Sequence, residues 1–298
     1  MSKDGKWAAQ ILAQQRADGS FGFIHTLSQG SGSPIPTEQA LRRLLVLGYT
    51  TEDKSIRRAL AYLVTCLEGQ QKIPDRQEKG HSWDLFVELM LSAWVRLLTH
   101  ENAHANRVAA LWRDIITGAF SSGAYSPADY TAVYTAAYGD KPHGPRLEDF
   151  VTFYQVSLLA GQLEPATERL VLNYLLHHEG GVYYLYRDPL AVPPPFCSRQ
   201  ASQYLGVLEL LARYSTAPDA LGFAADWLLQ NQQPDGGWDM GAKAQDGVYF
   251  PLSDSWRTPA LRQHDCTQRI QRLLDRLRPQ ASPRRNAALK EAHYGHSL

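Results

Sequence analysis

Apolar residues recur along much of this chain at the spacing of an amphipathic helix. In the segments 56–67 and 221–229 they stand three or four positions apart. That spacing places them on one stripe of a helix and leaves the opposite face polar. No alternation of the kind typical of β-strands is long enough to compete with this pattern. We therefore predict an all-α protein that contains helices with one buried face.

Other segments are apolar on nearly every side, which is typical of helices surrounded by protein. There are three of them, at residues 85–98, 150–159 and 201–211. In the first, Glu88, Ser92 and Arg96 stand four positions apart and form one polar stripe. This stripe faces either a central cavity or the solvent. Because one-faced segments precede the broadly apolar ones along the chain, we expect outer helices that each lead to an inner helix.

Turns that contain glycine divide the chain into similar units. The clearest are at Gly19, Gly123, Gly181 and Gly236, with a weaker turn near Gly69. Glycine readily adopts the positive φ that ends a helix. The turns recur at about fifty residues or twice that distance, which is a period of helical repeat proteins. The sequence predicts about five helix pairs, arranged as an α/α barrel or as an open solenoid.

The first and last of these turns share a longer motif. Residues 15–21 and 232–238 both read Gln-x-x-Asp-Gly-x-aromatic. The motif resembles the QW motif of squalene and oxidosqualene cyclases, whose repeat class includes the β-subunits of protein prenyltransferases. The resemblance implies an α/α toroid of concentric helices. It also implies a structural role for Gln15, Gly19, Phe21, Gln232, Gly236 and Trp238. Five hairpins are fewer than the well-known rings contain, so an incomplete ring remains open.

Composition narrows the class of protein. The 298 residues are 44% apolar, which is enough for a large core, and 30 Lys and Arg balance 30 Asp and Glu. A nucleic-acid partner is not expected, because such binding relies on clustered positive charge. No segment has the roughly 20 apolar residues of a membrane span, and the first residues lack the apolar run of a secretory signal. With three cysteines far apart in the sequence, we predict a cytoplasmic protein.

The repeats cover most but not all of the chain. We assign residues 1–278 to the toroid domain and residues 279–298, which begin at a proline and contain a second one, to a C-terminal extension. Residues 126–139 predict a short helix, with Pro127 at its first position and Gly139 at its end. Its three tyrosines, four residues apart, either line a mouth of the ring or pack on an outer helix.

The catalytic motifs of the similar families are not found. Triterpene cyclases use an Asp-x-Asp-Asp acid, but no two aspartates here stand two positions apart. Protein prenyltransferases hold zinc through an Asp-x-Cys pair, whereas Asp265 and Cys266 are adjacent and diverge by about 100° on a helix. Cys197 and His264 complete a set of zinc-ligand types without the close pairs of a structural site. We predict no cofactor, with zinc as the minor alternative.

Candidate site residues follow from the expected topology. If all inner helices run in one direction, their first residues surround one mouth of the ring. Asp84 and the pair His264–Asp265 are the candidate acid–base groups. The candidate ligand-binding residues lie at or near the starts of inner helices: Trp83, Asp149, Tyr154, Arg199, Trp256 and Arg257. Ser82 and Ser255 are the expected N-caps of two of these helices.

Three classes of function remain open. The resemblance implies an enzyme or degenerate enzyme that acts on or binds an isoprenoid or other apolar ligand in a central cavity. One alternative is a binding or scaffold protein that has lost its catalytic motifs. Another is a glycan-processing α/α barrel with paired carboxylates, for which Asp84 and Asp149 are candidates. Paired carboxylates inside the ring favour glycan chemistry, an aromatic cavity favours isoprenoids, and a filled ring favours a scaffold.

Overall fold

The computed structural model describes residues 2–25, 35–80, 82–246 and 252–278. All regular elements within these ranges are helices, which confirms the all-α prediction. The elements are η1 (Ser2–Asp4), α1 (Lys6–Leu12), α2 (Thr37–Val46), α3 (Lys54–Leu67), α4 (Trp83–Leu98), α5 (Ala103–Ala119), α6 (Pro127–Tyr138), α7 (Phe153–Leu159), α8 (Pro165–His177), α9 (Arg199–Leu211), α10 (Ala217–Ala220), α11 (Gly222–Gln230), η3 (Ala242–Ala244) and α12 (Pro259–Leu277). In the described ranges no helix is long and apolar enough to cross a bilayer.

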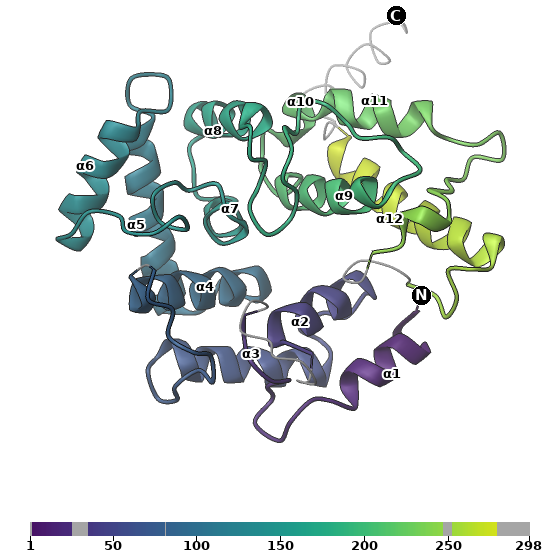
Figure 1. The fold of residues 1–298 in the computed structure, drawn as a ribbon, viewed down its shortest axis with the longest axis horizontal. Helices are drawn as coiled ribbons and strands as arrows, with labels where there is room; N and C mark the ends of the chain where they lie inside the picture. Colours follow the sequence, from purple (N-terminus) through teal and green to yellow (C-terminus); the bar gives the residue numbers. More distant parts are fainter. Residues whose placement is uncertain (1, 26–34, 81, 247–251, 279–298) are drawn as a thin grey trace, which may run out of the picture.

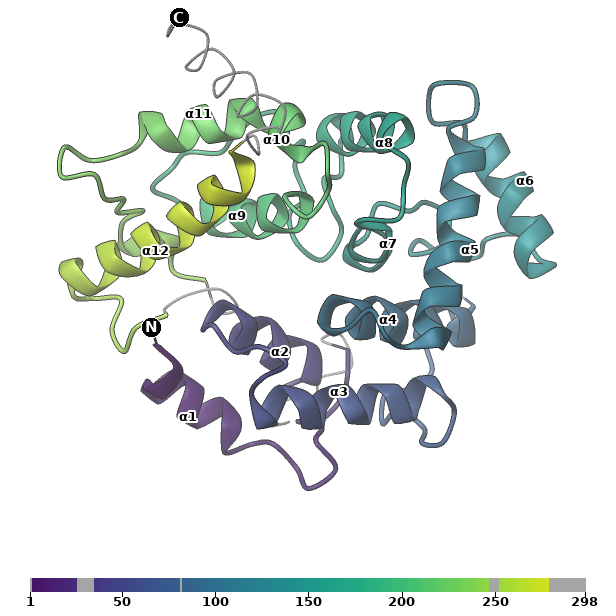
Figure 2. The same ribbon diagram turned by 180° about the vertical axis from the view of Figure 1, so that it is seen from behind.

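The helices follow one another around a ring, as Figures 1 and 2 show from opposite sides. The ring is joined where α1 meets the segment that precedes α12. The backbone N–H of Lys6 donates to Asp254 Oδ1 at 2.9 Å, and the indole N–H of Trp7 donates to the carbonyl of Ser253 at 2.8 Å. Residues about 250 positions apart in the chain therefore hold the two ends together.

The helices from the three broadly apolar segments, α4, α7 and α9, are buried on most sides as predicted, whereas α12 buries a single stripe although it also lines the interior. All seven residues of α7 are buried, whereas α3 buries one stripe that includes Ile56, Ala59 and Leu63. The helix α4 contacts α3, α5 and α7, and α9 contacts both α7 and α12. The inner series is α2, α4, α7, α9 and α12, and the outer helices that precede them are α1, α3, α5, α8 and α11.

The first and last repeat turns have the same hydrogen bonds. Gln15 Nε2 donates to the carbonyl of Gly19 at 3.0 Å, and Gln232 Nε2 donates to that of Gly236 at 2.7 Å. The next aromatic is anchored on the following inner helix, because the N–H of Phe21 donates to Thr37 and that of Trp238 to Thr267. The five repeat-turn glycines all have positive φ: Gly19, Gly69, Gly123, Gly181 and Gly236.

Two starts of inner helices differ from the prediction. The helix α12 begins at Pro259 after Thr258, so the prediction that Ser255 caps it is wrong, and Trp256 and Arg257 precede the helix. Proline fits the first helical turn because it has no N–H to satisfy there. Ser82 does occupy the position before α4, but its side chain makes no capping hydrogen bond.

The predicted short helix is present, and its tyrosines pack inside the protein. Ser126 caps α6, and Gly139 ends it with φ +81°. Tyr134 and Tyr138 lie against the ring of Trp112 on α5, at centroid distances of 6.1 and 6.5 Å. The polar stripe of α4 also faces α5, because Glu88 pairs with His104 and Arg96 bonds to Asn106. The tyrosines pack α6 on α5, and the polar stripe packs the inner helix α4 on the outer helix α5.

Candidate functional site

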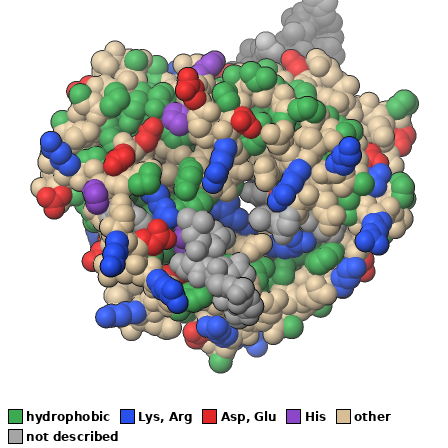
Figure 3. Space-filling view, in the orientation of Figure 1, with side chains coloured by type: hydrophobic (Ala, Val, Ile, Leu, Met, Phe, Trp, Pro, Cys, Tyr) green, Lys and Arg blue, Asp and Glu red, His purple; other side chains and the backbone are tan. Residues whose placement is uncertain are grey.

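A cavity of about 680 Å³ lies between the inner helices. Residues of α2, α4, α7, α9 and α12 all contribute to its lining. Its size falls within the usual range of small-molecule sites. Figure 3 shows a hollow near the middle of one face, with Lys and Arg side chains gathered around it.

Much of the cavity wall is apolar. The rings of Trp94 and Phe153 lie in contact, with centroids 5.4 Å apart. The remaining apolar lining includes Leu45, Val46, Leu97, Leu185, Leu210, Leu252 and Leu273. An apolar ligand that replaces water against such a wall gains about 25 cal/mol for each Å² it buries. This part of the cavity therefore suits a hydrocarbon chain or ring.

The same cavity is strongly basic. Five arginines line it: Arg42, Arg213, Arg269, Arg272 and Arg276. Glu209 is the one carboxylate among the described lining residues, and Arg269 Nε binds it at 2.6 Å. The described lining thus carries four more positive than negative formal charges, an excess that favours an anion.

Helix geometry explains how the arginines come together. Arg269, Arg272 and Arg276 on α12 stand three and four positions apart, so they share one face. Arg276 lies in the last turn of α12, where the helix dipole favours a positive charge. Arg213 follows the end of α9 and donates to Ser157 Oγ at 3.1 Å. Burial is the main cause that lowers the pKa of Arg213, so a nearby anion would stabilise its charged form.

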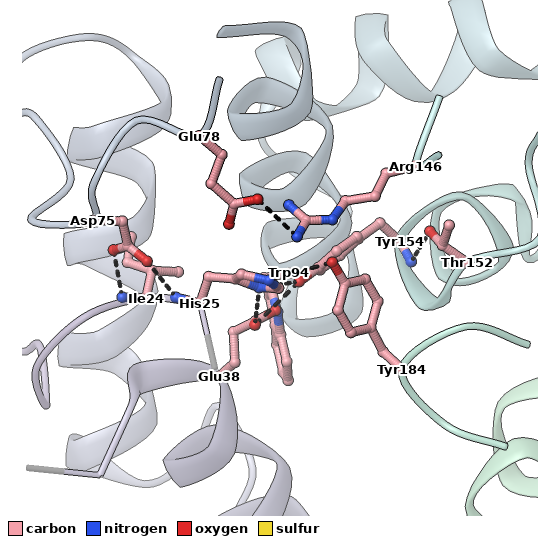
Figure 4. Close-up of polar contacts among 10 residues, drawn as sticks. All are labelled: Ile24, His25, Glu38, Asp75, Glu78, Trp94, Arg146, Thr152, Tyr154 and Tyr184. Atoms are coloured by element: carbon pink, nitrogen blue, oxygen red, sulfur yellow. Dashed lines mark hydrogen bonds and ion pairs between the residues drawn. The ribbon is translucent and has the colours of Figure 1, made fainter. Parts of the chain in front are cut away.

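A buried polar network lies directly beside the cavity (Figure 4). The carboxylate of Glu38 on α2 accepts the indole N–H of Trp94 at 2.6 Å and the hydroxyl of Tyr154 at 3.1 Å. His25 Nδ1 lies 3.0 Å from Glu38 Oε2 and 2.7 Å from Tyr154 Oη. On its other side, Nε2 of His25 is 3.3 Å from the hydroxyl of Tyr184. His25, Glu38 and Tyr154 are at most 2% exposed.

Backbone contacts fix both ends of this network. The carboxylate of Asp75 accepts the N–H groups of Ile24 and His25 at 2.7 and 2.8 Å, which holds the segment before α2. Tyr184 has a φ of +75°. Among the described residues other than glycine, it is the one with a positive φ. Such a conformation is costly for tyrosine and persists only when its surroundings impose it. Here Val182 and Tyr186 pair across it, at 2.8 Å from N to O.

The electrostatics of the network favour an ionised Glu38. Burial by itself would raise the pKa of this carboxyl group, but the hydrogen bond and charge of His25, the charge of Arg42 and the indole of Trp94 together hold it below its ordinary value. Burial and the charge of Glu38 raise the pKa of Tyr154 well above its ordinary range. Because an ionised carboxylate can only accept hydrogen bonds, the Nδ1–H of His25 donates to Glu38.

A paired arginine lies beside this network. Arg146 lies over the ring of Phe86 at 4.6 Å and pairs with Glu78 at 2.9 Å, so its charge is compensated.

The structure does not gather the candidate rim residues around the cavity. Trp83 is buried and packs on Phe86 at 5.8 Å, and Asp84 is exposed on the first turn of α4. Arg199 lies 3.7 Å from Asp246, and Trp256 Nε1 donates to the carbonyl of Gly241 at 3.2 Å. Arg257 is exposed. None of the residues predicted at the helix starts belongs to the described lining.

The other candidates have separate surroundings. Asp149 accepts the hydroxyl of Tyr174 on α8 at 3.1 Å and so faces an outer helix. Asp265 accepts two backbone N–H groups and the hydroxyl of Ser253, and burial raises the pKa of its carboxyl group. His264 lies in a separate surface depression beside Gln263. Of the candidate residues, Tyr154 alone belongs to the network beside the cavity.

The metal candidates lie around one short segment. Met240 N donates to Cys266 Sγ at 3.5 Å, and Cys197 Sγ donates to the carbonyl of Asp239 at 3.9 Å. Burial raises the pKa of the Cys266 thiol to about 12, which disfavours the thiolate that a metal requires. Within the described ranges, no three His, Cys, Asp or Glu side chains are grouped as metal ligands.

Apart from Tyr154, the residues that form this site carry no motif in the sequence. His25 and Glu38 are single polar residues on opposite sides of residues 26–34, and no motif joins them. The arginines of α12 did carry a readable signal, because three of them share one face of an inner helix. A basic face is unusual for a helix inside a ring, and it should have indicated an anion.

Comparison of the chain with protein-family models, with curated proteins and with solved structures finds no match.

Proposed function

We propose that this chain binds an anionic amphiphile, with an isoprenoid-like or acyl-like apolar part, in its central cavity. The observation that carries this proposal is the presence of five arginines and a large apolar wall in one cavity of about 680 Å³. The apolar part of the ligand would lie against Trp94 and Phe153. Its anionic group would lie among Arg213, Arg272 and Arg276, where charge-assisted hydrogen bonds are strong.

The lining also weighs against the two alternatives. Glycan hydrolysis needs two carboxyl groups that converge on the substrate, whereas the described lining has Glu209, which is tied to Arg269. A pure scaffold has no need of an open interior with unbalanced charge. The proposal is one of binding, because the sequence lacks both the acid motif and the zinc motif of the similar enzyme families.

Binding of decane-1-sulfonate, decan-1-ol and methanesulfonate, measured by isothermal titration calorimetry, tests this function. We expect decane-1-sulfonate to bind more tightly than either of the others, because it alone has both an apolar chain and a permanent negative charge. Arg276→Gln and Arg272→Gln should each weaken its binding by roughly tenfold, the value of one charge-assisted hydrogen bond.

The matched control is Arg257→Gln, which removes an exposed arginine that is not part of the described lining. It should leave the affinity for decane-1-sulfonate unchanged. Equal binding of decane-1-sulfonate and decan-1-ol, or an equal loss in all three arginine variants, would contradict the proposal.

A further inference from the structure

A smaller pocket lies between two outer helices, and none of its described lining residues belongs to the central cavity. Its volume is about 230 Å³. Phe120 and Tyr125 contribute to its wall from the end of α5 and the turn that follows, and Tyr174 and His178 contribute from the end of α8. Figures 1 and 2 show α5 and α8 as neighbours on the same side of the ring. The pocket opens at the protein surface, because part of its lining is exposed.

Three aromatic rings form much of the pocket wall. Those of Phe120, Tyr125 and Tyr174 lie against one another, with centroids 4.5 to 6.0 Å apart. Phe150, which is fully buried, stacks on Tyr174 at 5.5 Å and holds that ring in place. The face of an aromatic ring carries partial negative charge, so it attracts a cation within about 6 Å of its centre. Such a wall favours a positively charged group over a neutral group of the same shape.

The carboxylate of Asp149 adds a full negative charge next to this wall. The hydroxyl of Tyr174 donates to its Oδ2 at 3.1 Å, and the hydroxyl of Tyr125 also bonds to it. Hydrogen bonds polarise the groups that they join, and a phenol that donates to a carboxylate gains electron density in its ring. Both tyrosine rings should therefore attract a cation more strongly than they would without Asp149.

The partners of Asp149 do not fully compensate its charge. His178 Nε2 lies 3.6 Å from Oδ2, beyond hydrogen-bond distance, and Nδ1 of the same ring lies 3.2 Å from the carbonyl oxygen of Gly181. Desolvation raises the pKa of Asp149 despite the charge of His178 and the hydrogen bonds from both tyrosines. The described lining of the pocket contains no Lys or Arg. A cation bound in the pocket would supply the charge that is missing.

We propose that this pocket binds a small molecule through a trimethylammonium group, the group that choline carries. Its methyl groups need no hydrogen-bond acceptor, whereas a primary ammonium has three donors to satisfy. The hydroxyls of Tyr125 and Tyr174 are already bonded to Asp149, so the ring faces are the main contact surface that they offer. The volume lies below the usual range for drug-sized ligands, which suits a compact group.

Nuclear magnetic resonance titrations at pH 8 with choline and with 3,3-dimethylbutan-1-ol test the proposal. The alcohol has the shape of choline, with a carbon atom in place of the charged nitrogen. We expect choline to bind roughly tenfold more tightly, the effect of about two cation–π contacts. At this pH imidazole groups are ordinarily neutral, so they do not repel the cation. Signals of Tyr125 and Tyr174 should shift, whereas the indole N–H signal of Trp94 beside the central cavity should not.

Asp149→Asn keeps the size of the side chain but removes its charge. It should weaken choline binding by roughly tenfold and leave the binding of the alcohol unchanged. The matched control is Asp226→Asn, which removes an exposed carboxylate on α11 outside the lining and should change neither affinity. Tyr125→Leu, in the turn after α5, is a second variant that leaves Asp149 in place. It should weaken choline binding by roughly threefold, because one ring face is lost.

A trimethylated lysine side chain carries the same group, and N-acetyl-trimethyllysine methylamide distinguishes this source. We expect it to bind no more tightly than choline, and tighter binding would overturn the assignment to a small molecule. Equal binding of choline and the alcohol, or an equal loss in Asp149→Asn and Asp226→Asn, would overturn the cation site itself. None of these results bears on the anion proposed for the central cavity, because the two sites share no described lining residue.

Discussion

At the scale of single residues, the surroundings of two carboxyl groups shift their pKa values in opposite directions. Glu38 is surrounded by donors and by Arg42, which hold its pKa below the ordinary value of 4.5. Asp149 is half-buried beside aromatic rings, and desolvation raises its pKa despite hydrogen bonds from Phe150 and Tyr174 and the charge of His178. The two shifts differ in direction because the partners of Glu38 outweigh its desolvation, whereas those of Asp149 do not.

The two carboxyl groups should therefore affect stability with opposite pH dependences. A carboxyl group with a depressed pKa stabilises the fold above its unfolded pKa, and this is lost as the pH falls through its folded value. The destabilisation caused by Glu38→Gln should thus shrink as the pH is lowered below about 4.5. A group with a raised pKa favours the fold at low pH, so any destabilisation by Asp149→Asn should shrink as the pH rises.

Urea unfolding of the wild type and both variants across this pH range measures the two differences. Parallel pH profiles for the two variants would contradict the assignment. Because each comparison is made against the same wild-type curve, the titration of all other groups cancels.

At the scale of elements, the repeat turns join the outer helices to the inner ones. All five glycines have positive φ, but their surroundings differ. A Cβ atom on Gly19 would lie 2.2 Å from the carbonyl oxygen of Arg58, so α3 packs directly on this turn. A Cβ atom on Gly123 would meet nothing within 4 Å. The same local conformation thus serves a tight helix contact in one repeat and an open turn in another.

This difference predicts unequal effects of the same substitution. Gly123→Ala should cost about 1–2 kcal/mol, the penalty of a left-handed conformation for alanine. Gly19→Ala should cost about 1–3 kcal/mol more, because the backbone of α3 must also move. Chemical denaturation of both variants gives the two free energies of unfolding. Equal losses would show that the contact with Arg58 is not close.

At the scale of the whole molecule, the cavity exists because the ring of helices is joined at its ends. Trp7 on α1 donates to Ser253, and its ring also receives the guanidinium of Arg43 at 5.2 Å. Asp265 of α12 holds the same segment through the N–H groups of Leu252 and Ser253. Since Leu252 lines the cavity, the junction of the ring also forms part of its wall.

Loosening this junction should affect the cavity. Trp7→Ala removes a partly buried ring and its hydrogen bond, which should cost about 2–4 kcal/mol, somewhat less than a fully buried tryptophan. Hydrogen exchange should rise in α1 and around Ser253, and the affinity for decane-1-sulfonate should fall. Trp7→Phe keeps most of the ring and should lose only about 1 kcal/mol with the hydrogen bond. Faster exchange that is spread evenly over all helices would contradict a local opening.

The sequence by itself determined the secondary structure and the repeats. Apolar spacing is a local property, so it predicted one-faced α3 and fully buried α7, and the glycine positions predicted the turns with positive φ. The two ends of α6 could be predicted because capping is also local: Ser126 and Gly139 lie directly before and after the helix that they cap. The predicted start of α12 was wrong, because the helix begins at Pro259 and not directly after Ser255.

The tertiary structure alone decided the site. His25, Glu38 and Tyr154 stand up to 129 positions apart, and no spacing along the chain brings an imidazole to a particular carboxylate. The arginines of the cavity come from α2, the end of α9 and α12, and they share one space only because those helices surround it. Which end of each inner helix faces the cavity depends on helix packing over the whole ring. The residues at the helix starts therefore did not predict the lining of the cavity. Hydrophobic patterning determines which face of a helix is buried, but it does not determine what lies opposite the ends of the helix.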